Sequence, residues 1–444
     1  MGRLFGTDGI RGAANVDVTP TLATDLGRAV THLLGSPGGS VVVGQDTRRS
    51  GDMLVAAVTA GLTSAGANVL QLGVVTTPCL VHAVASGEHV AGIMVSASHN
   101  PADDNGLKVV SGGRKIDDAV EEELEGLILH PETLPRPGNA EMGTVRIDAG
   151  LATSAYREHL LEAAGDALAG LRIGLDCANG SAAGLAPDLF AEMGAQVTAI
   201  NASPDGTNIN RDSGSTHPQG LAALVLERGL DMGFAFDGDA DRLIAVDAAG
   251  GLVDGDAVMG ICALQMLAAG TLRNATLVVT VLSNGGLDRA ISAAGGRVLR
   301  TPVGDRHVME AMERVDAALG GEQSGHVIFR DRADTGDGML TAIELVKAVR
   351  SAGGSTLADL AASIPRLPQV MLNSAVRHRD SWELDPVFAG AVADAETRLG
   401  MRGRILVRPS GTEPKLRIMV EGDKLDEISE IARELDELAR ARLD

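Results

Sequence analysis

Large aromatic side chains are scarce in this sequence of 444 residues, which has one tryptophan, one tyrosine and six phenylalanines. The cores must therefore be built from Ala, Val, Leu and Ile, and together with 56 glycines this composition suits repeated strand–turn–helix units. The chain is too long for one ordinary core, and at about 150 residues per domain it predicts roughly three domains, with three or four compact units expected.

Cysteine is also rare. Cys79, Cys177 and Cys262 are odd in number, far apart in sequence and without a C-x-x-C pair, so the sequence indicates neither a disulfide framework nor a zinc site. The N-terminus lacks an apolar signal region, and no apolar run approaches the roughly 18 residues of a membrane span. We therefore expect a cytoplasmic protein without a membrane partner.

Positive charge is in short supply, with 38 Lys and Arg against 59 Asp and Glu and a formal net charge of −21. This balance argues against a nucleic-acid partner, because polyanions are repelled. A small phosphorylated ligand would need local Arg and Lys. Neither a Walker A motif nor a helix-opening G-x-G-x-x-G is present, so nucleotide and dinucleotide binding lose their usual support.

Strand–turn–helix patterns begin near residues 41, 171 and 276, and a Pro-rich polar segment at 131–137 looks like a boundary. In the first unit, Thr19 and Pro20 predict the start of a helix, residues 41–43 a buried strand, and Ser50 the cap of a second helix. After residue 368 the pattern predicts strand, helix, two strands and a charged helix. We therefore predict α/β domains at 1–150, 151–254 and 255–366, and a smaller α+β domain at 367–444.

A serine follows a predicted strand in the first domain. Residues 90–95 are apolar, and Ser98, His99 and Pro101 lie in the turn after them, which places the Ser98 hydroxyl at a strand end near solvent. A Ser–His hydrolase is disfavoured, because adjacent residues on an extended chain point in opposite directions and no G-x-S-x-G elbow is present. Taken alone, the segment favours an ordinary turn serine.

Three aspartates at alternate positions form a stronger signal. Asp237, Asp239 and Asp241 follow an apolar segment, and their carboxylates repel one another unless a cation neutralises them. Mg²⁺ is the natural occupant, since it takes hard oxygen ligands and leaves a position for a phosphate oxygen. Spacing excludes an EF-hand, because Arg242 and Ala248 stand where Gly and Glu are needed. A solvated acidic turn is the alternative.

Two further loops carry groups suited to sugar phosphates. Residues 408–414 read Arg-Pro-Ser-Gly-Thr-Glu-Pro, which indicates either a phosphate cradle or an ordinary Pro-Gly hairpin turn. Residues 321–326 read Gly-Glu-Gln-Ser-Gly-His and offer Glu322 and Ser324 to sugar hydroxyls, or form a polar turn entering a strand. Arg11 is a candidate phosphate contact and Lys108 a candidate acid or base, although each also fits a plain surface residue.

Taken together and in this order, these four loops closely resemble those of the α-D-phosphohexomutase superfamily, and the match covers essentially the whole chain. The specificity lies in the succession of loops, one for each domain. The resemblance implies three similar α/β domains with mixed sheets plus a smaller C-terminal α+β domain, arranged around a central active-site cleft. It also implies an isomerase that moves a phosphoryl group within a sugar phosphate.

The resemblance implies roles for individual residues. Ser98 would carry the phosphoryl group and, with Asp237, Asp239 and Asp241, would bind one Mg²⁺ per active site, while a bisphosphorylated sugar would act as activator. His99 and Arg11 would support the serine loop, and Lys108 would take the proton of the attacking hydroxyl. The residues assigned to sugar and phosphate binding are Arg242, Asp305, Arg306, Glu322, Ser324, Arg408, Ser410, Gly411, Thr412 and Arg417.

Finer marks resemble the superfamily members that act on glucosamine phosphates. They are the serine loop Ile-Met-Val-Ser-Ala-Ser-His-Asn-Pro, Gln323, and the segment 303–307, although His307 stands where Tyr is more frequent. Such an enzyme interconverts glucosamine 6-phosphate and glucosamine 1-phosphate through glucosamine 1,6-bisphosphate. Its product would feed UDP-N-acetylglucosamine and cell-wall precursor synthesis.

Three alternatives remain open. A phosphomannomutase/phosphoglucomutase of the same superfamily would share the catalytic residues and differ in the sugar. A haloacid-dehalogenase-like phosphatase would use Asp237 as nucleophile, although Asp241 stands where those enzymes usually have Thr or Val. A sugar-phosphate binding protein without turnover would have little use for Ser98. The sequence leaves the oligomeric state open, with a homodimer as one candidate.

Overall fold

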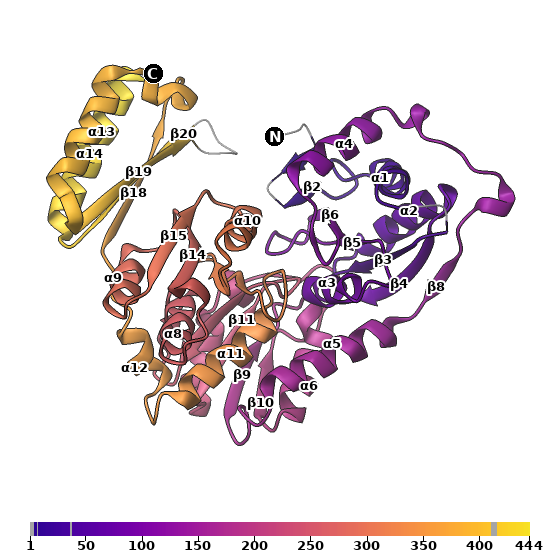
Figure 1. Ribbon diagram of the computed structural model, residues 1–444, viewed down its shortest axis with the longest axis horizontal. Helices are drawn as coiled ribbons and strands as arrows, with labels where there is room; N and C mark the ends of the chain where they lie inside the picture. Colours follow the sequence, from indigo (N-terminus) through magenta and orange to yellow (C-terminus); the bar gives the residue numbers. More distant parts are fainter. Residues whose placement is uncertain (1–3, 7, 36–37, 410–414) are drawn as a thin grey trace. The chain divides into compact units, whose positions relative to one another are not determined.

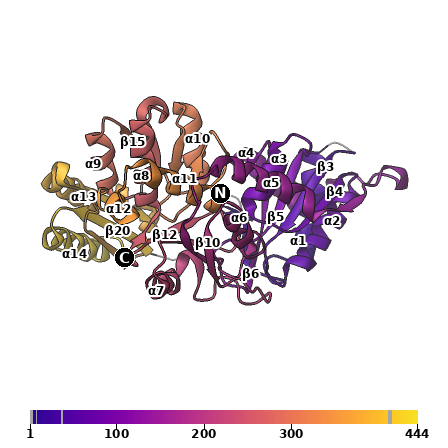
Figure 2. The same cartoon turned by 90° about the horizontal axis from the view of Figure 1, so that it is seen from below.

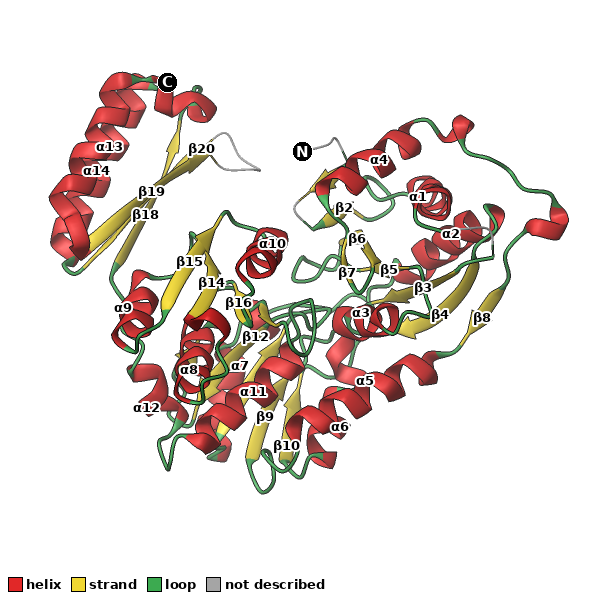
Figure 3. Cartoon of the chain, in the orientation of Figure 1, coloured by secondary structure: helices red, strands yellow, loops and turns green. Residues whose placement is uncertain are grey.

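The computed structural model describes residues 4–6, 8–35, 38–409 and 415–444. The chain divides into two compact units, residues 1–280 with 299–362 and residues 281–298 with 363–444. Figures 1 and 3 label most of the helices and strands.

The first unit begins with an eight-stranded mixed sheet in the order β1-β2-β6-β5-β3-β4-β8, with β7 paired to β6. Strands β3, β4, β5 and β8 pair in parallel, whereas β1, β2, β6 and β7 pair antiparallel. The strands are β1 Phe5–Gly6, β2 Gly9–Ala13, β3 Ser40–Gln45, β4 Asn68–Val74, β5 Ala91–Val95, β6 Asp104–Ser111, β7 Arg114–Lys115 and β8 Val145–Ile147. The helices are α1 Pro20–Leu33, α2 Gly51–Ser64, α3 Thr77–Ala85 and α4 Asp118–Leu129.

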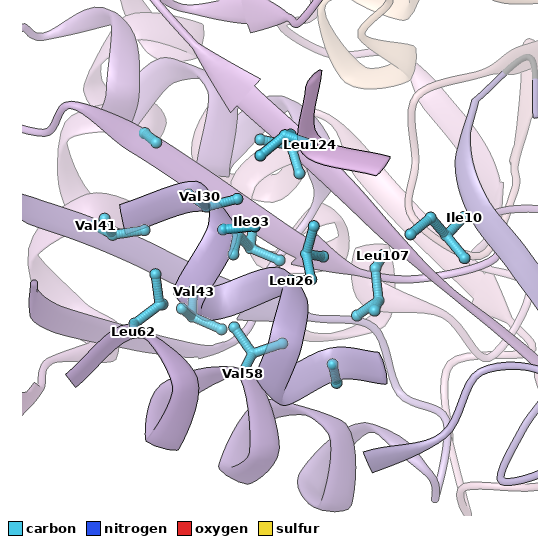
Figure 4. Packing of buried hydrophobic residues seen from close by; sticks show 14 of the residues in the cluster. Ile10, Leu26, Val30, Val41, Val43, Val58, Leu62, Ile93, Leu107 and Leu124 are labelled. Atoms are coloured by element: carbon cyan, nitrogen blue, oxygen red, sulfur yellow. The ribbon is translucent and has the colours of Figure 1, made fainter. Parts of the chain in front are cut away.

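The core of this part lies between the sheet and helices α1, α2 and α4. Figure 4 shows Leu26 and Val30 of α1 and Val58 of α2 over Val43 and Ile93 of the sheet. Alternate strand residues point to one face of a sheet, so a run such as Val41–Val43 can be buried on both faces. Helix α3 packs against the sheet through contacts with β3 and β5, and α5, Ala149–Ala164, contacts β4.

Two smaller sheets follow. The second has the order β10-β9-β11-β12-β13 and the third the order β15-β14-β16-β17, and each combines parallel and antiparallel pairs. Their strands are β9 Arg172–Asp176, β10 Gln196–Ile200, β11 Met232–Phe236, β12 Leu243–Asp247, β13 Leu252–Val253, β14 Thr276–Thr280, β15 Arg297–Thr301, β16 Leu319–Gly321 and β17 Val327–Phe329. The helices of this part are α6 Ala186–Glu192, α7 Gln219–Arg228, α8 Gly255–Ala268, α10 Asp305–Val315, α11 Gly338–Ser351 and α12 Leu357–Ala362, which Figure 2 shows from a second direction. Helix α9, Gly285–Ala293, falls within the second unit. Short 3₁₀ turns occupy Pro131–Thr133, Asn139–Glu141, Ser181–Gly184, Gly214–Thr216 and Arg273–Ala275.

The second unit contains a three-stranded antiparallel sheet in the order β18-β20-β19, packed against two helices. Its elements are β18 Gln369–Ala375, α13 Pro386–Leu399, β19 Gly403–Pro409, β20 Lys415–Gly422 and α14 Leu425–Arg442, with 3₁₀ turns at Arg379–Leu384 and Gly400–Arg402. The predicted order of strand, helix, two strands and helix is confirmed. Helix α13 begins directly after Asp385, which accepts from the Phe388 amide at 2.8 Å, and Pro386 occupies its first turn.

One expected helix cap is wrong. Thr19 caps α1 by accepting from the Leu22 amide at 3.2 Å, as predicted. Ser50 precedes α2, but its side chain makes no cap hydrogen bond and instead accepts from Asn105 Nδ2 at 2.8 Å. The backbone of Ser50 is already helical, and a capping side chain needs an extended residue there.

Among the residues that the structure describes, no helix combines the length and the apolar character that a membrane span needs.

Candidate active site

Ser98 lies in the loop after β5, and the structure differs from both expectations for it. The residue is buried rather than near solvent, and its φ of 51° is left-handed rather than extended. Its hydroxyl therefore donates to Asp237 Oδ2 at 2.6 Å, and it also lies 3.3 Å from His99 Nδ1. The loop after β11 covers the serine so closely that a Cβ on Gly238 would lie 2.6 Å from the Ser98 carbonyl oxygen.

The three aspartates meet as predicted from their spacing. Asp237, Asp239 and Asp241 lie between β11 and β12, are buried, and place one carboxylate oxygen each within 4.8 Å of the others. Among the residues that the structure describes, Asp239 Oδ1 and Asp241 Oδ1 are buried without a hydrogen-bond partner. Buried, unpartnered carboxylate oxygens are costly unless a cation approaches them. The donor set fits a hard divalent cation such as Mg²⁺.

Mutual repulsion shows in the protonation of the cluster. Burial and the neighbouring Asp241 and Asp239 raise the pKa of Asp237 to about 8. Burial also opposes a charge on Asp241, but Lys108 and His326 outweigh it and hold its pKa well below the ordinary value. The cluster therefore divides into a carboxylate that resists ionisation and one that is firmly ionised, which is typical of a site built to receive positive charge.

Lys108 comes from β6 and reaches the cluster through a buried side chain. Its Nζ lies 2.7 Å from Asp239 Oδ2, 3.7 Å from Asp241 Oδ2 and 3.1 Å from Asp8 Oδ2. Burial opposes its charge, but Asp239, Asp8 and Asp241 raise its pKa above the ordinary value. Lys108 is thus an ammonium group in this arrangement, ready to donate a proton or neutralise an anion, and it must first lose a proton to act as the expected base.

His99 is held neutral by its surroundings. Burial, then Arg242 and Arg11, lower its pKa to about 4 from an ordinary 6.5. Below pH 6.5 the unfolded chain binds a proton that the folded chain refuses, so the stability from this group is present above pH 6.5 and is lost as the pH falls toward 4.

We therefore expect acid to destabilise the wild type more than His99→Gln. Between pH 7.5 and pH 5 the free energy of unfolding should fall by about 2 kcal/mol more in the wild type. Urea unfolding followed by circular dichroism in EDTA measures this difference at the two pH values. If the free energy of unfolding fell by the same amount in the two proteins, the lowered pKa of His99 would be contradicted.

The loop between β16 and β17, which we expected to contact sugar hydroxyls, is held together by hydrogen bonds to Glu322. Glu322 Oε1 accepts from the Gly304 amide at 3.1 Å, and Ser324 Oγ donates to Oε2 at 3.3 Å. Arg242 brings its Nε to 3.9 Å from Asp237 Oδ2 and 3.8 Å from Asp241 Oδ1. Arg242 thus borders the acidic cluster. Burial opposes its charge, but Asp237, Asp241 and Glu322 raise the pKa of Arg242 above its ordinary value.

Asp305 and Arg306, expected to bind substrate, form ion pairs across the first unit. Asp305 pairs with Lys115 of β7, which also pairs with Asp8. Arg306 NH1 lies 3.1 Å from Glu121 Oε2 of α4. Arg11 likewise pairs with Asp8. Asp305, Arg306 and Lys115 also line a cavity of about 540 Å³.

Two residues beside the cluster were missed from the sequence. Thr77, at the first turn of α3, donates from Oγ1 to Asp239 Oδ2 at 2.5 Å, and its amide donates to the Asp239 carbonyl at 3.0 Å. His326 accepts from the Gly336 amide at Nε2, which leaves its proton on Nδ1, 3.6 Å from Asp241 Oδ2. His326 stood in the quoted Gly-Glu-Gln-Ser-Gly-His motif and could have been chosen, whereas Thr77 carried no motif signal.

In the second unit, Arg408 and Arg417 face each other across β19 and β20. Like charges directly opposite destabilise a sheet unless an anion lies between them. Burial and Arg417 lower the pKa of Arg408, and in the described part of the chain Arg417 Nε is buried without a partner. Ser410, Gly411 and Thr412 lie outside the described residues.

Four domain models of one family together match most of the chain. The matches are phosphoglucomutase/phosphomannomutase alpha/beta/alpha domain I at residues 2–134, domain II at 154–250, domain III at 254–367 and the C-terminal domain at 371–438. The predicted fold class, three similar α/β domains plus a smaller C-terminal domain, is thereby confirmed.

Comparison with individual proteins identifies the family more closely. A solved phosphoglucomutase/phosphomannomutase family protein from Burkholderia thailandensis is 27% identical with a TM-score of 0.83, and the match covers 99% of this chain and 98% of that one. The solved N-acetylphosphoglucosamine mutase from Aspergillus fumigatus, in complex with GlcNAc-6P and magnesium, shares the fold at 17% identity and a TM-score of 0.67, over 99% and 95% of the chains. A phosphoglucosamine mutase from Moorella thermoacetica is 49% identical over 443 residues, 99% of each chain. The chain therefore belongs to the phosphoglucosamine mutase family.

Proposed function

We propose that this protein interconverts glucosamine 6-phosphate and glucosamine 1-phosphate by passing a phosphoryl group through Ser98. The observation that carries the proposal is the buried Ser98 hydroxyl, 2.6 Å from Asp237 within a cluster of three aspartates. A hydroxyl at this position is next to the charges that a phosphoryl-transfer site must balance. The similarity to a phosphoglucosamine mutase over 99% of each chain supports glucosamine phosphate as the substrate.

The proposed cycle begins with phosphorylated Ser98. The free hydroxyl of the sugar phosphate attacks the phosphorus, the bond from phosphorus to Ser98 Oγ breaks, and glucosamine 1,6-bisphosphate forms. The bisphosphate turns around, Ser98 Oγ attacks the phosphorus of the other phosphate, and the bond from that phosphorus to the sugar oxygen breaks, which restores the phosphoserine and releases the isomer. In each half of the cycle Lys108, an ammonium in contact with the cluster, donates a proton to the departing oxygen, and the amine so formed takes the proton of the attacking hydroxyl, which restores the ammonium.

Asp237, Asp239 and Asp241, together with a phosphate oxygen on Ser98, are the groups that would hold Mg²⁺. The buried, unpartnered oxygens of Asp239 and Asp241 are the observation that supports this assignment. When bound, the ion would neutralise negative charge on the transferring phosphoryl group. A bisphosphorylated sugar would act as the activator that first loads Ser98.

The proposal also assigns the residues that would bind the substrate. Glu322 and Ser324 contact sugar hydroxyls, and Arg242 borders the reacting phosphoryl group. Arg408 and Arg417 bind the phosphate that does not react, which explains why two arginines face each other on adjacent strands. Binding energy from that distant phosphate orients the sugar for reaction.

The three free cysteines suit our assignment of the protein to the cytoplasm.

Competing sugar phosphates test the proposed substrate. With Mg²⁺ and a catalytic amount of the matching bisphosphate, we expect kcat/KM to be highest for glucosamine 6-phosphate among the 6-phosphates of glucosamine, mannose and glucose. A coupled assay of each 1-phosphate product measures the ranking. If glucosamine 6-phosphate were the poorest of the three, the related phosphomannomutase/phosphoglucomutase activity would replace this proposal. If none turned over, the mutase function itself would fail.

A further inference from the structure

Arg48 is fully buried beside the loop that carries Ser98, with no exposure of its side chain. Its Nε donates to Asp46 Oδ2 at 2.9 Å. Its two terminal nitrogens donate to backbone carbonyls within residues 98–104, at 2.8 to 3.0 Å for the three with ordinary distances. The carbonyls are those of Ser98, Asn100, Pro101 and Asp104. A single guanidinium therefore holds the whole turn, since only this planar group presents donors along three directions at once.

The turn that Arg48 holds is strained at Ser98. A non-glycine residue in the left-handed region keeps that conformation only where the surrounding structure fixes it. The Ser98 amide donates to Ser96 Oγ at 2.9 Å, and the Ser96 hydroxyl donates to Asp46 Oδ2 at 2.6 Å. Asp46 accepts from both Ser96 and Arg48, so the amide and the carbonyl of Ser98 are both tied to one carboxylate.

A second donor reaches the same carbonyls from the part of the chain between β10 and α7. Asn210 Nδ2 donates to the Ser98 carbonyl at 2.8 Å and to the Asn100 carbonyl at 3.0 Å. These are the carbonyls that one terminal nitrogen of Arg48 also contacts, at 3.0 and 2.8 Å. The conformation of Ser98 is therefore set from two sides, by groups that have no contact with a reacting atom.

We propose that Arg48 is a positioning residue for phosphoryl transfer, because its hydrogen bonds to the 98–104 carbonyls hold Ser98 in the conformation that aims Oγ at Asp237. The inference rests on the proposed function of Ser98. Lysine at position 48 keeps the positive charge beside Asp46 but has one donor atom, which cannot reach carbonyls spread over seven residues of chain. In-line transfer depends on placement, and a shift of about 1 Å costs roughly 100-fold in rate.

Arg48→Lys in the full-length protein tests this directly. We expect kcat for glucosamine 6-phosphate to fall about 100-fold, with KM within about threefold of wild type, because the groups that bind sugar and phosphate are unchanged. In the same variant, the rate at which glucosamine 1,6-bisphosphate phosphorylates Ser98, measured by intact-mass spectrometry, should fall by a similar factor. Asn210→Gly removes the second donor at a residue whose φ of 57° suits glycine, and it should lower kcat about tenfold.

Two matched variants separate positioning from stability. Arg28 is also buried, and its NH2 donates to the Pro131 and Leu134 carbonyls at 3.0 and 3.3 Å, so Arg28→Lys removes the same kind of contact from a segment without Ser98. We expect Arg28→Lys to lower the Tm by about as much as Arg48→Lys does and to leave kcat unchanged. Arg49→Lys, at the exposed neighbour of Arg48, should change neither.

The outcomes distinguish the two proposals. If the wild type turns over and Arg48→Lys retains kcat within threefold, the positioning role is refuted while the mutase function stands. The positioning role is also refuted if Arg28→Lys and Arg48→Lys lower the Tm equally and lower kcat by the same factor. Should Arg48→Lys fail to fold, Asn210→Gly decides, because an unchanged kcat in that variant refutes the role. A wild type without turnover refutes the proposed function itself.

Discussion

Ser98→Ala should abolish interconversion of the glucosamine phosphates, with kcat reduced at least about 10⁴-fold. The variant lacks the protein oxygen that the proposed cycle phosphorylates, and a fall of this size corresponds to an activation free energy about 5 kcal/mol higher. The substitution removes one buried oxygen and no carbon, so the fold should persist. Initial rates in the coupled assay, with Mg²⁺ and bisphosphate present, measure the loss.

Ser111→Ala is the matched control for this variant. Ser111 ends β6 in the same sheet, and its hydroxyl donates to the Val90 carbonyl at 3.1 Å, outside the acidic cluster. It should retain wild-type kcat. If Ser98→Ala kept more than about a tenth of the wild-type kcat, another group would have to carry the phosphoryl transfer, and the cycle proposed here would be wrong.

Removal of divalent metal should have an effect of comparable size. The cluster holds three carboxylates within 4.8 Å, and without a cation the transferring phosphoryl group would meet this negative charge uncompensated. We expect exhaustive treatment with EDTA to lower kcat at least about 10³-fold and Mg²⁺ to restore it. Activity that survived complete chelation would contradict the assignment of the cluster as a metal site.

The variant Asp239→Asn tests whether the metal dependence of kcat arises from the acidic cluster. Its Oδ1 is one of the buried oxygens without a partner among the described residues, and the amide should raise the Mg²⁺ concentration needed for half-maximal activity at least tenfold. Asp247→Asn is the control, because Asp247 lies at the end of β12, where Oδ1 accepts from the Ala249 and Gly251 amides at 2.8 Å. It should leave the Mg²⁺ dependence unchanged.

The parts of the site that could be predicted from the sequence are those in which neighbouring residues act together. Asp237, Asp239 and Asp241 lie on one short loop, so their spacing alone indicated a cation site, and the structure places them together. Arg408 and Arg417, which the resemblance assigned to phosphate binding, lie on two strands that the pattern predicted in succession, and the structure places them opposite each other. In the same way, hydrophobic periodicity and turn residues located α1, α13 and the strands of the second unit, because those patterns are local.

The parts that could not be predicted depend on contacts between distant segments. Thr77 reaches Asp239 across 162 positions of sequence, and its own segment shows only a helix start. The burial of Ser98 follows from the loop of the second sheet that covers it, and the left-handed turn follows from Arg48 and Asn210. No propensity favours that conformation for serine, so tertiary contacts had to impose it. Ser50 shows the same limit, because its side chain bonds to Asn105 rather than to its own helix.

Mapping of the phosphate on the wild-type protein decides most directly whether Ser98 is the group that carries it. The protein is incubated with glucosamine 1,6-bisphosphate and Mg²⁺, digested, and its phosphopeptide sequenced by mass spectrometry before and after treatment with hydroxylamine. We expect one phosphate on Ser98 that resists hydroxylamine, as a serine ester does. A phosphate on Asp237 that hydroxylamine releases, or turnover by a protein that never carries phosphate, would contradict transfer through Ser98.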